Sequence, residues 1–556
     1  MAEAEKTPMA TPTNQTKFLN ETLGDLLERI ASERPNHQAV KYIESDFDLS
    51  YGEFNSRVDR VGKGLMGMGV NKGDHVAVWA TNYPQWLLLF FAVAKIGAVL
   101  VTVNTNYKTR ELEYLLKQSD AKVLVMCDGL KDIDCERIIY DLCPELNDCE
   151  PGKLNSSKLP KLKILITLDN KYKGMFHWSE VFEQGENITE EEFAARKRYI
   201  QPHDVANIQY TSGTSGFPKG VMLTHYNIIN NGLSIGDCMK FTPEDRLCIP
   251  VPFFHCFGMV LAILAAVTHG STMLPLLWYT PMKVMHTVTY EKCTAVHGVP
   301  TMFIAMLEHR DFDKYDFSSL RTGIMAGSPC PTEIMKQVIE KMNMRDITIV
   351  YGQTESSPGC TQTTVDDSIE HRVNTVGKCL PGVEAKIVDP ETGETLPPNQ
   401  PGEFCARGYN VMKGYYNMPE KTAEVIDADG WLHTGDIAMV DSDGYYKITG
   451  RLKDMIIRGG ENVYPKEIED FIYTHPKVKD VQVVGKKDEK YGEEIVAFVI
   501  PKEGAELTEK EIKNFVYDNM SRHKEPGHVV FLKEFPMNAA GKILKYQLRD
   551  MADKLA

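Results

Sequence analysis

The sequence has no excess of positive charge, since its formal net charge is −15 at pH 7. The phosphate backbone of nucleic acids rewards Lys and Arg, so this balance argues against nucleic acid as the main partner. Basic and acidic side chains are equal in number from residue 451 to the end, which leaves the whole negative surplus on residues 1–450. A neutral C-terminal region can approach a polyanionic ligand without the repulsion that the rest of the chain would impose.

Long hydrophobic runs are also absent. The most apolar stretch, residues 86–103, is interrupted by Lys95 and Gly97, which indicates a buried helix followed by a buried strand rather than a membrane span. Residues 1–18 are polar and show neither the order of a secretory signal nor the Arg enrichment of a transit peptide. We therefore expect a disordered N-terminus and no transmembrane segment, which leaves only peripheral contact with a membrane open.

Paired CxxC motifs, which are typical of zinc sites, do not occur among the twelve cysteines. In a large chain without an export signal, reduced thiols are the default state of cysteine. The sequence therefore predicts a cytoplasmic protein. Nothing in the sequence sets its oligomeric state.

Strand-like and amphipathic helical runs alternate through the first 450 residues. Examples are a strand at 75–79, a helix at 85–95, a strand at 98–103, a helix at 110–118 and a strand at 122–126. This alternation predicts an α/β protein in which parallel or mixed sheets are covered by helices. The length of the chain exceeds what one hydrophobic core supports, so we expect at least two domains.

The last hundred residues follow a different pattern, that of a small α+β unit. Its signals are a proline that begins a helix, two strand-like runs and a helix capping box: Pro465, 478–484, 495–501, Thr508 and Glu511. We place the boundary at Lys453. The chain then divides into a large domain over residues 19–452 and a small C-terminal domain over residues 453–556.

The most informative segment is a loop rich in glycine and hydroxyl side chains, YTSGTSGFPKGVMLTH at 210–225, which follows a strand-like run and precedes a helix that Thr224 is placed to cap. Glycine lets the main chain approach an oligophosphate, which backbone N–H groups, hydroxyls and a lysine then bind. The spacing before Gly-Lys differs from that of the Walker motif. The candidate phosphate-binding residues are Thr211, Ser212, Gly213, Thr214, Ser215, Gly216 and Lys219.

Four further segments follow in chain order: YGQTE at 351–355, WLHTGD at 431–436, GRLKDMIIRGGENVYPKEIE at 450–469 and NAAGKILK at 538–545. Together with the glycine-rich loop, they resemble the adenylate-forming, or AMP-binding, enzymes in their acyl-CoA synthetase and fatty-acid–CoA ligase branch. The resemblance covers nearly the whole chain after the first thirty residues. It implies a large N-terminal domain that binds ATP and the acyl group, and a mobile C-terminal lid domain.

The resemblance also implies a reaction in two steps. A carboxylic acid attacks ATP to give an acyl-AMP and pyrophosphate, and coenzyme A then takes the acyl group and releases AMP. Lys542 would neutralise charge in the first step, Thr354 would donate to a phosphate oxygen, and Glu355 would hold Mg²⁺, which accepts one or two carboxylates beside phosphate oxygens. The expected cofactors and co-substrates are therefore ATP, Mg²⁺ and coenzyme A.

The same resemblance assigns the nucleotide and coenzyme A contacts. Tyr351 would lie on adenine, Asp436 would accept the ribose hydroxyls with Arg451 beside it, and Lys453 would be the hinge of the lid. Three residues would admit the pantetheine arm of coenzyme A: Gly459, Gly460 and Glu461. The remaining candidates for nucleotide binding are Gly327, Ser328, Pro329, Gly352 and Gln353.

The segment VPFFHCFGMV at 251–260 resembles the acyl-side segment of the family, and here it is aromatic and aliphatic. The ammonium group of an amino-acid substrate would lack a partner there. With His255, Val299 and Met302 as candidate pocket residues, the segment favours a medium- or long-chain fatty acid. Two alternatives stay open, namely an aryl-acid CoA ligase of the coumarate type and a ligase that passes the acyl group from acyl-AMP to an acyl carrier protein.

Overall fold

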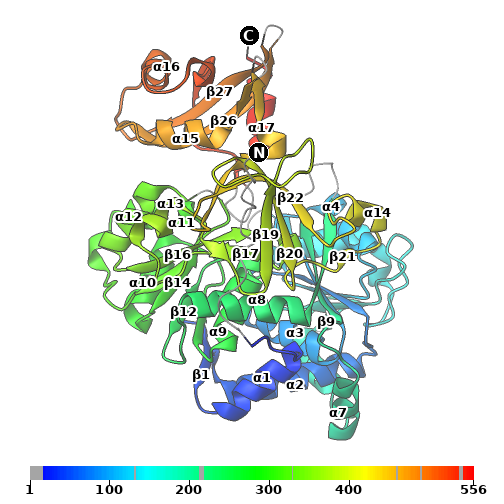
Figure 1. The fold of residues 1–556 in the computed structure, drawn as a ribbon. Coiled ribbons are helices and arrows are strands. Elements are labelled where there is room, and N and C mark those ends of the chain that lie inside the picture. The colour runs from blue at the N-terminus through cyan, green and yellow to red at the C-terminus, as the bar shows by residue number, and fades with distance from the viewer. Residues whose placement is uncertain are drawn as a thin grey trace.

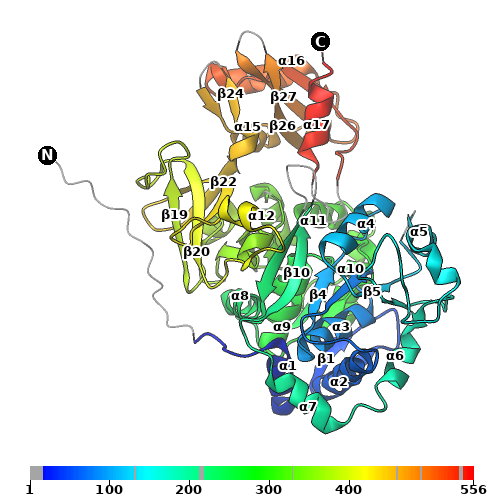
Figure 2. The ribbon, with the colours of Figure 1, turned by 90° about the vertical axis from the view of Figure 1, so that its right-hand side faces the viewer.

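A computed structural model describes residues 17–130, 133–211, 218–328, 330–458, 461–488, 491–537 and 543–555. It has the α/β architecture that the alternating pattern predicts, with a large N-terminal body and a smaller C-terminal domain at one end of it (Figures 1 and 2). Three sheets build the described part of the large body, and a fourth lies in the C-terminal domain. A two-stranded ribbon of β6 (Gly129–Leu130) and β7 (Ile133–Asp134) stands apart from them.

Nine strands form the first sheet within the described residues. Its centre is parallel from β1 to β16, and antiparallel strands flank that centre at both edges. In spatial order the strands are β18 (Lys378–Cys379), β17 (Gly359–Gln362), β16 (Asp346–Gly352), β15 (Thr322–Met325), β14 (Ala295–Gly298), β12 (Arg246–Ile249), β13 (Thr272–Pro275), β1 (Gln38–Lys41) and β2 (Asp48–Ser50).

Eight described strands form the second sheet, which is parallel except where β11 pairs with β10 and β21. In spatial order they are β21 (Gly414–Tyr415), β11 (Lys219–Thr224), β10 (Val205–Thr211), β4 (Val99–Thr102), β3 (His75–Trp79), β5 (Val123–Met126), β8 (Ile164–Thr167) and β9 (Phe176–His177). The central strands β4 and β5 are buried along their whole length, and β3 is buried after its first residue, His75, as expected of parallel strands covered on both faces.

Helices cover both sheets, as Figures 1 and 2 show, and α8 packs against the helical segment η2 in the interior of the body. The helices of the large body are α1 (Leu23–Glu33), α2 (Tyr51–Gly67), α3 (Pro84–Lys95), α4 (Thr109–Gln118), α5 (Cys135–Leu142), α6 (Trp178–Gln184), α7 (Glu190–Arg198), α8 (His225–Cys238), η2 (Phe257–Leu264), α9 (Ala265–Thr268), α10 (Pro281–Glu291), α11 (Pro300–Leu307), α12 (Thr332–Lys341), α13 (Ile369–Asn374) and α14 (Pro419–Ala423). Within the described ranges, no helix combines the length and the apolar character that crossing a membrane requires.

The third sheet is an antiparallel meander that ends the large body. Its strands are β19 (Val383–Val388), β20 (Gly402–Gly408), β22 (Leu432–Val440) and β23 (Tyr446–Arg451). Beyond it, the C-terminal domain packs its helices against its own sheet, around a core that includes Ile468, Val483 and Ile512. Its elements are β24 (Ile456–Arg458), β25 (Glu461–Val463), α15 (Pro465–Tyr473), β26 (Val478–Asp488), β27 (Gly492–Pro501), α16 (Glu509–Tyr517), β28 (His528–Phe531) and α17 (Lys545–Ala552).

Most of the predicted elements are confirmed within one or two residues. The strand at 75–79 and the helix at 85–95 correspond to β3 and α3. Pro465 is the first residue of α15, and Thr508 caps α16 through the N–H of Glu511 at 3.2 Å. The predicted order of a helix, two strands and a second helix in the small domain is also correct, as α15, β26, β27 and α16.

The helix predicted after the glycine-rich segment is confirmed, since Thr224 caps α8 by accepting the N–H of Asn227 at 3.1 Å. The structure adds strand β11 between the loop and this helix. Residues 1–16 of the expected disordered N-terminus lie outside the described residues, whereas the ring of Phe18 lies 4.9 Å from that of Tyr409.

Candidate active site

A buried carboxylate lies at the centre of the site. Oδ2 of Asp436 accepts a hydrogen bond from the hydroxyl of Tyr351 at 2.9 Å, and Oδ1 lies 2.9 Å from Nε of Arg451. Asp436 is 4% exposed. Burial, followed by the charge of Asp436, raises the pKa of the Tyr351 hydroxyl, and the same carboxylate raises the pKa of the Arg451 guanidinium. The structure thus brings together the three residues that the sequence assigned to adenine and ribose.

Strand pairing explains this arrangement. Asp436 and Arg451 face each other in the ladder between β22 and β23, while Tyr351 lies near the end of β16 in the first sheet. The ring of Tyr351 meets that of Phe404 edge to face, with centroids 5.1 Å apart. Ligands of open α/β sheets bind beyond the carboxyl ends of the strands, and Tyr351 occupies such an end.

A second polar group contains Glu355. Oε1 of Glu355 accepts a hydrogen bond from the hydroxyl of Tyr415 at 2.8 Å. That hydroxyl in turn lies 3.1 Å from Nζ of Lys219, which sits 4.2 Å from the centroid of the tyrosine ring. Tyr415 therefore links a carboxylate and a cation that are far apart in the sequence. Burial, followed by the charge of Glu355, raises the pKa of the Tyr415 hydroxyl, so the phenol stays protonated and can donate.

The glycine-rich loop is held at both ends by strand pairing. Thr211 and Lys219 are partners in the antiparallel ladder of β10 and β11, so the loop is the connection of a hairpin that lies beside the edge strand β21 of the second sheet. Its central candidates lie outside the described residues, and they are Ser212, Gly213, Thr214, Ser215 and Gly216.

The acyl-side residues adjoin the phosphate-side residues at Thr354. Its Oγ1 lies 3.7 Å from Sγ of Cys256, which is buried. Burial raises the pKa of the Cys256 thiol to about 12. The preceding residue, His255, accepts the N–H of Phe257 on Nδ1 at 3.1 Å. One contact therefore connects the YGQTE motif with the apolar segment at 251–260.

Close approaches also join the predicted pocket wall to the adenine-side loop. Gly327 has a φ of +87°, and a Cβ there would lie 3.1 Å from Cγ1 of Val299, so glycine suits both the backbone and the contact. Val299 and Met302 are both buried at the start of α11. Tyr279 donates to the carbonyl oxygen of Met302 at 2.9 Å, which fixes this end of the helix.

The remaining motif residues around Tyr351 shape the backbone. A Cβ on Gly352 would lie 1.8 Å from the carbonyl oxygen of Pro358, which no other residue could tolerate. Gln353 precedes the short 3-10 helix η4 (Thr354–Ser356), and its N–H donates to Oγ of Ser356 at 3.1 Å. Ser328 accepts the thiol of Cys330 on its carbonyl oxygen at 3.5 Å. These contacts hold the backbone of both loops in place.

Lys453 lies in the 3-10 turn η5 (Leu452–Asp454), between the last strand of the large body and the first strand of the C-terminal domain. Burial, followed by the charge of Arg451, lowers the pKa of Lys453. The carboxylate of Asp454 binds Arg549 on α17 of the C-terminal domain. Arg451 thus contacts the large body, whereas Asp454 contacts the C-terminal domain.

Several predicted residues cannot be placed. Glu461 begins β25, where its backbone pairs with Arg458, and its side chain is outside the described structure. The candidates that lie wholly outside the described residues are Pro329, Gly459, Gly460 and Lys542, together with the five central residues of the glycine-rich loop.

Two parts of the site were missed from the sequence. Tyr415 was not singled out, although it lies in a segment, residues 407–424, whose amino-acid sequence resembles that of the fatty-acid branch of the family. The apolar segment was expected only as a pocket wall, whereas residues 257–264 form a buried π-helix, η2. Such helices are rare and frequently occur at functional sites, but no sequence signal distinguishes one from a buried α-helix.

Comparison with known proteins agrees with this geometry. Residues 27–416 match the family model of the AMP-binding enzyme, and residues 467–542 match that of the AMP-binding enzyme C-terminal domain. YngI of Bacillus subtilis (strain 168), a proposed acyl-CoA synthetase, is 53% identical over 96% of this chain and 97% of its own length. The mitochondrial medium-chain acyl-CoA ligase ACSF2 of Rattus norvegicus is 41% identical over 97% of this chain and 88% of its own.

Solved structures agree as well. The ATP-bound crystal structure of MatB from Rhodopseudomonas palustris superposes with a TM-score of 0.83 at 29% identity, over 96% of this chain and 99% of that one. The apo structure of the same enzyme has a TM-score of 0.73 at the same identity and coverage. The match of both family models in the expected order, together with the relatives, shows that the chain belongs to the AMP-binding enzymes, in their acyl-CoA synthetase branch.

Proposed function

We propose that this acyl-CoA synthetase activates a medium- or long-chain fatty acid as its acyl-AMP, releases pyrophosphate, and then transfers the acyl group to coenzyme A. The observation that carries the proposal is the contact between Thr354 and Cys256. It joins the polar groups around Glu355 to the buried apolar segment that follows His255. A fatty acid lying along that segment would present its carboxylate where a phosphate would be held.

The nucleotide would be held by groups that are already oriented. An ionised carboxylate offers about four lone-pair positions, and Tyr351 and Arg451 use one on each oxygen of Asp436. Two positions are then left for the hydroxyls of a ribose. Because Arg451 and Tyr351 fix the rotation of the carboxylate, it would bind the sugar without further ordering.

Mg²⁺ fits the donors that surround Glu355. This ion prefers carboxylate and phosphate oxygens and keeps several waters, and Glu355 supplies one half-buried carboxylate whose Oε1 is held by Tyr415. We infer that Glu355 holds the ion together with the phosphates of ATP. The ion would neutralise charge on the departing pyrophosphate, while Lys219 and Thr354 would bind phosphate oxygens directly.

The choice of a fatty acid rests on the apolar wall. All eight residues of η2 are buried and hydrophobic or glycine. His297 fastens this helix to the first sheet, since its Nδ1 accepts the N–H of Ile324 at 3.3 Å and its Nε2 donates to the carbonyl oxygen of Leu261 at 3.0 Å. Burial lowers the pKa of His297 to about 4, so the imidazole is neutral at pH 7 and adds no charge beside the acyl chain.

We further infer that the C-terminal domain alternates between two positions about Lys453. The present arrangement resembles ATP-bound MatB more than apo MatB, with TM-scores of 0.83 and 0.73, which supports assigning it to the first half-reaction. Lys479 of the C-terminal domain lies 2.6 Å from Glu308 of the large body, and rotation would break this exposed ion pair. Lys542 would act in this position, and Gly459 to Glu461 in the other.

A cytoplasmic location is also proposed. All twelve cysteines are free in the structure, and free thiols are the default of a reducing compartment. The names of the ACSF2 relatives place those proteins in mitochondria. Organelle fractionation, with an antibody that detects this protein in each fraction, distinguishes a cytoplasmic from a mitochondrial location. Recovery in the mitochondrial fraction would contradict the proposal.

Pyrophosphate release from a panel of acids, measured with and without coenzyme A, tests the proposed reaction. Fatty acids of medium or longer chain should release pyrophosphate, and coenzyme A should convert a single burst into steady turnover. Preference for cinnamates would favour the aryl-acid alternative. Steady turnover with an acyl carrier protein, but not with coenzyme A, would favour the carrier-loading alternative.

A further inference from the structure

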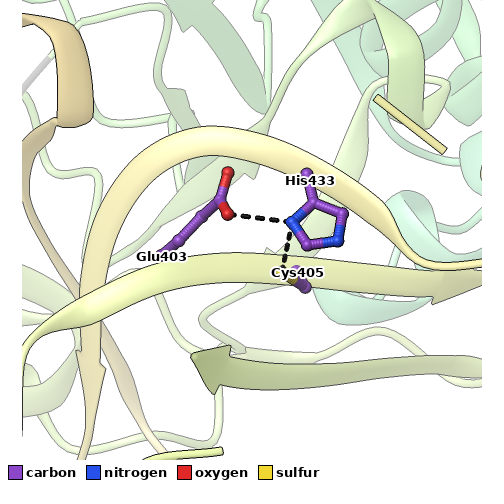
Figure 3. A group of neighbouring side chains, drawn as sticks. All are labelled: Glu403, Cys405 and His433. Carbon is purple, nitrogen blue, oxygen red and sulfur yellow. Dashed lines mark hydrogen bonds and ion pairs between the residues drawn. The ribbon is translucent and has the colours of Figure 1, made fainter. Parts of the chain in front are cut away.

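A compact group of three side chains of types that bind metals lies close in sequence to Asp436 and takes no part in the proposed reaction. Nδ1 of His433 is 2.9 Å from Oε2 of Glu403 and 3.4 Å from Sγ of Cys405 (Figure 3). Strand pairing creates the group, because Cys405 of β20 and His433 of β22 are direct partners in the third sheet. All three ligand atoms lie within 4.8 Å of one another.

We propose that Glu403, Cys405 and His433 form a binding site for a divalent cation of the zinc class. Zinc binds thiolate sulfur at about 2.3 Å and imidazole nitrogen or carboxylate oxygen at about 2.0–2.2 Å, so tetrahedral ligands lie about 3.3–3.6 Å apart. The sulfur and the imidazole nitrogen are already at that separation, 3.4 Å. The separation of 2.9 Å between the carboxylate oxygen and the nitrogen would have to grow by about half an ångström, and a water molecule would complete the four ligands.

A carboxylate behind the imidazole supports this assignment independently. Oδ2 of Asp427 is 3.5 Å from Nε2 of His433, on the opposite edge of the ring from Cys405 and Glu403. Metal-binding histidines almost always direct their second nitrogen at a carboxylate, a backbone carbonyl or a water molecule, which fixes the ring and raises its basicity. Asp427 is itself held, since its Oδ1 accepts the N–H groups of Asp429 and Trp431, each at 2.9 Å.

The second oxygen of Glu403 is held in the same way. Its Oε1 accepts the N–H of Gly435 at 3.0 Å, which leaves Oε2 as the atom that faces His433 and would ligate. Two of the three ligands thus have a partner that orients them and is not itself a ligand. An ordinary salt bridge between Glu403 and His433 would require neither Asp427 nor a sulfur atom at this distance.

The burial of the group suits a soft cation. Cys405 is fully buried and Glu403 is 9% exposed, whereas the side chain of His433 is 34% exposed and provides access from solvent. A zinc-class cation binds cysteine as its thiolate, so binding would release the thiol proton to solvent.

A cation at this site would affect the backbone next to Asp436, the carboxylate proposed to bind ribose. Gly435 immediately precedes Asp436 within strand β22. A cation that fixes Glu403 would also fix the hydrogen bond from Gly435 and hence the backbone beside the ribose-binding carboxylate. We therefore expect the bound cation to stabilise the folded protein, because a ligand that binds only the native state raises its free energy of unfolding.

Titration of the purified full-length protein with Co²⁺ tests the proposal. One equivalent should produce the near-ultraviolet charge-transfer band of a thiolate bound to cobalt, and Zn²⁺ should displace it. Cys405→Ala should abolish the band. Asp427→Asn should keep the band but weaken Co²⁺ binding by about 10–100-fold, the usual loss when an orienting partner of a ligand is removed. Cys149→Ala is the matched control, because this half-exposed thiol lies outside the group.

Thermal melting checks that the variants are folded. Zn²⁺ should raise the melting temperature of the wild type and of Cys149→Ala but leave that of Cys405→Ala unchanged. If Cys405→Ala melts early without metal, Glu403→Gln serves instead, since its amide oxygen can still accept the N–H of Gly435. Persistence of the cobalt band in a folded Cys405→Ala or Glu403→Gln variant, loss of the band in Cys149→Ala, or the absence of stoichiometric binding to the wild type would each overturn the proposal.

Discussion

Nε of Arg451 lies 2.9 Å from Oδ1 of Asp436, and the two residues are direct partners across the last two strands of the large body. The carboxylate proposed to bind ribose and the last residue of β23 are therefore one rigid pair. Two residues further on, Lys453 lies in a short turn, and Asp454 already binds Arg549 of the C-terminal domain. Strand pairing thus ends where the proposed rotation would begin.

We expect Asp436→Asn to weaken ATP binding while the protein stays folded. The substitution keeps a hydrogen-bond acceptor for Tyr351 but removes the charge that pairs with Arg451 and would bind the ribose hydroxyls. Hydrogen bonds to charged groups contribute about 1.5–3 kcal/mol, so the KM for ATP should rise by about 10–100-fold. Initial rates against ATP concentration measure this rise.

A carboxylate in the same hairpin provides the control for that substitution. Asp441 lies in the turn between β22 and β23, where Oδ1 accepts the N–H groups of Asp443 and Tyr445 at 2.9 and 2.8 Å. Asp441→Asn should leave the KM for ATP unchanged. If both variants raise the KM equally, distortion of the hairpin rather than loss of a ribose contact is responsible, and the assignment of Asp436 fails.

The requirement for Mg²⁺ should depend on Glu355. In Glu355→Gln the amide oxygen can still accept the hydroxyl of Tyr415, but the charge that would attract the ion is lost. The Mg²⁺ concentration that gives half-maximal pyrophosphate release should rise by at least about tenfold, from the loss of one charged ligand. Tyr415→Phe keeps the charge and should raise the requirement much less. Full wild-type activity in excess EDTA would remove Glu355 from a metal site.

The chain length of the preferred acid should respond to Met302. Replacing this buried residue at the start of α11 by Trp narrows the proposed acyl pocket. Each methylene that no longer fits should cost about 0.8 kcal/mol of binding, or about fourfold in affinity. The optimum of kcat/KM across saturated fatty acids should therefore move to shorter chains.

The opposite face of the same helix supplies a control for the pocket. Ile304 is half-buried and packs against a different hydrophobic core from that of Met302. Ile304→Trp should leave the chain-length profile as it is in the wild type. An unchanged profile in Met302→Trp would mean that another element forms the end of the pocket.

The sequence predicts the parts of the site that consist of contiguous motifs. Asp436 and Arg451 were paired correctly because each lies in its own motif and the two strands form a hairpin. The contact of Tyr415 with Glu355 and Lys219 could not be predicted, because it needs the approach of β21 to β11 across about two hundred residues of sequence.

The proposed metal-binding group could not be predicted from the sequence for the same reason, since one of its residues is distant in the chain from the other two. Glu403 and Cys405 are two residues apart, but His433 comes 28 residues after Cys405, so the spacing matches no CxxC pattern. Only the register of β20 against β22 brings the three together. Hydrophobic periodicity likewise identifies η2 as buried without revealing its π-helical hydrogen bonding, because both helix types bury such a run equally well.

The stability of the C-terminal domain should depend on pH through Asp480. Burial, with a further contribution from Glu469, raises the pKa of this carboxyl from its ordinary value to about 6 in the folded state. Between the ordinary pKa of about 4 and pH 6 the folded state then binds more protons than the unfolded state, so stability falls as pH rises through this window. Above pH 6 the cost of the buried charge is constant.

Asp480→Asn removes that cost. The amide oxygen of the substituted side chain can still accept the N–H of Val481. At pH 7 the variant should be more stable than the wild type by about 1–2 kcal/mol in free energy of unfolding, after allowance for partial exposure, and should therefore melt at a higher temperature. The gain should vanish near pH 4. Asp518→Asn, an exposed carboxylate of the same domain, should show no such dependence. If the wild type and Asp480→Asn melt at the same temperature as each other both at pH 4 and at pH 7, the pKa assignment is contradicted.

The rotation of the C-terminal domain is tested by Lys453→Pro. Proline fixes φ near −65° and removes one soft dihedral, so the domain should stay in the position that it adopts on folding. The resemblance to ATP-bound MatB favours the position for adenylation, in which Lys542 acts. The variant should release pyrophosphate in one burst, close to one per active site, and should carry bound acyl-AMP after purification.

Lys453→Ala separates the hinge from the charge. Both substitutions remove the ammonium group, whose pKa is lowered by burial and by Arg451, but only proline restricts the backbone. Alanine should therefore retain steady turnover to acyl-CoA, whereas proline should make almost none. Formation of acyl-CoA by Lys453→Pro at the rate of Lys453→Ala would show that no rotation about this residue is needed. The proposal that one alternating domain serves both half-reactions would then have to be abandoned.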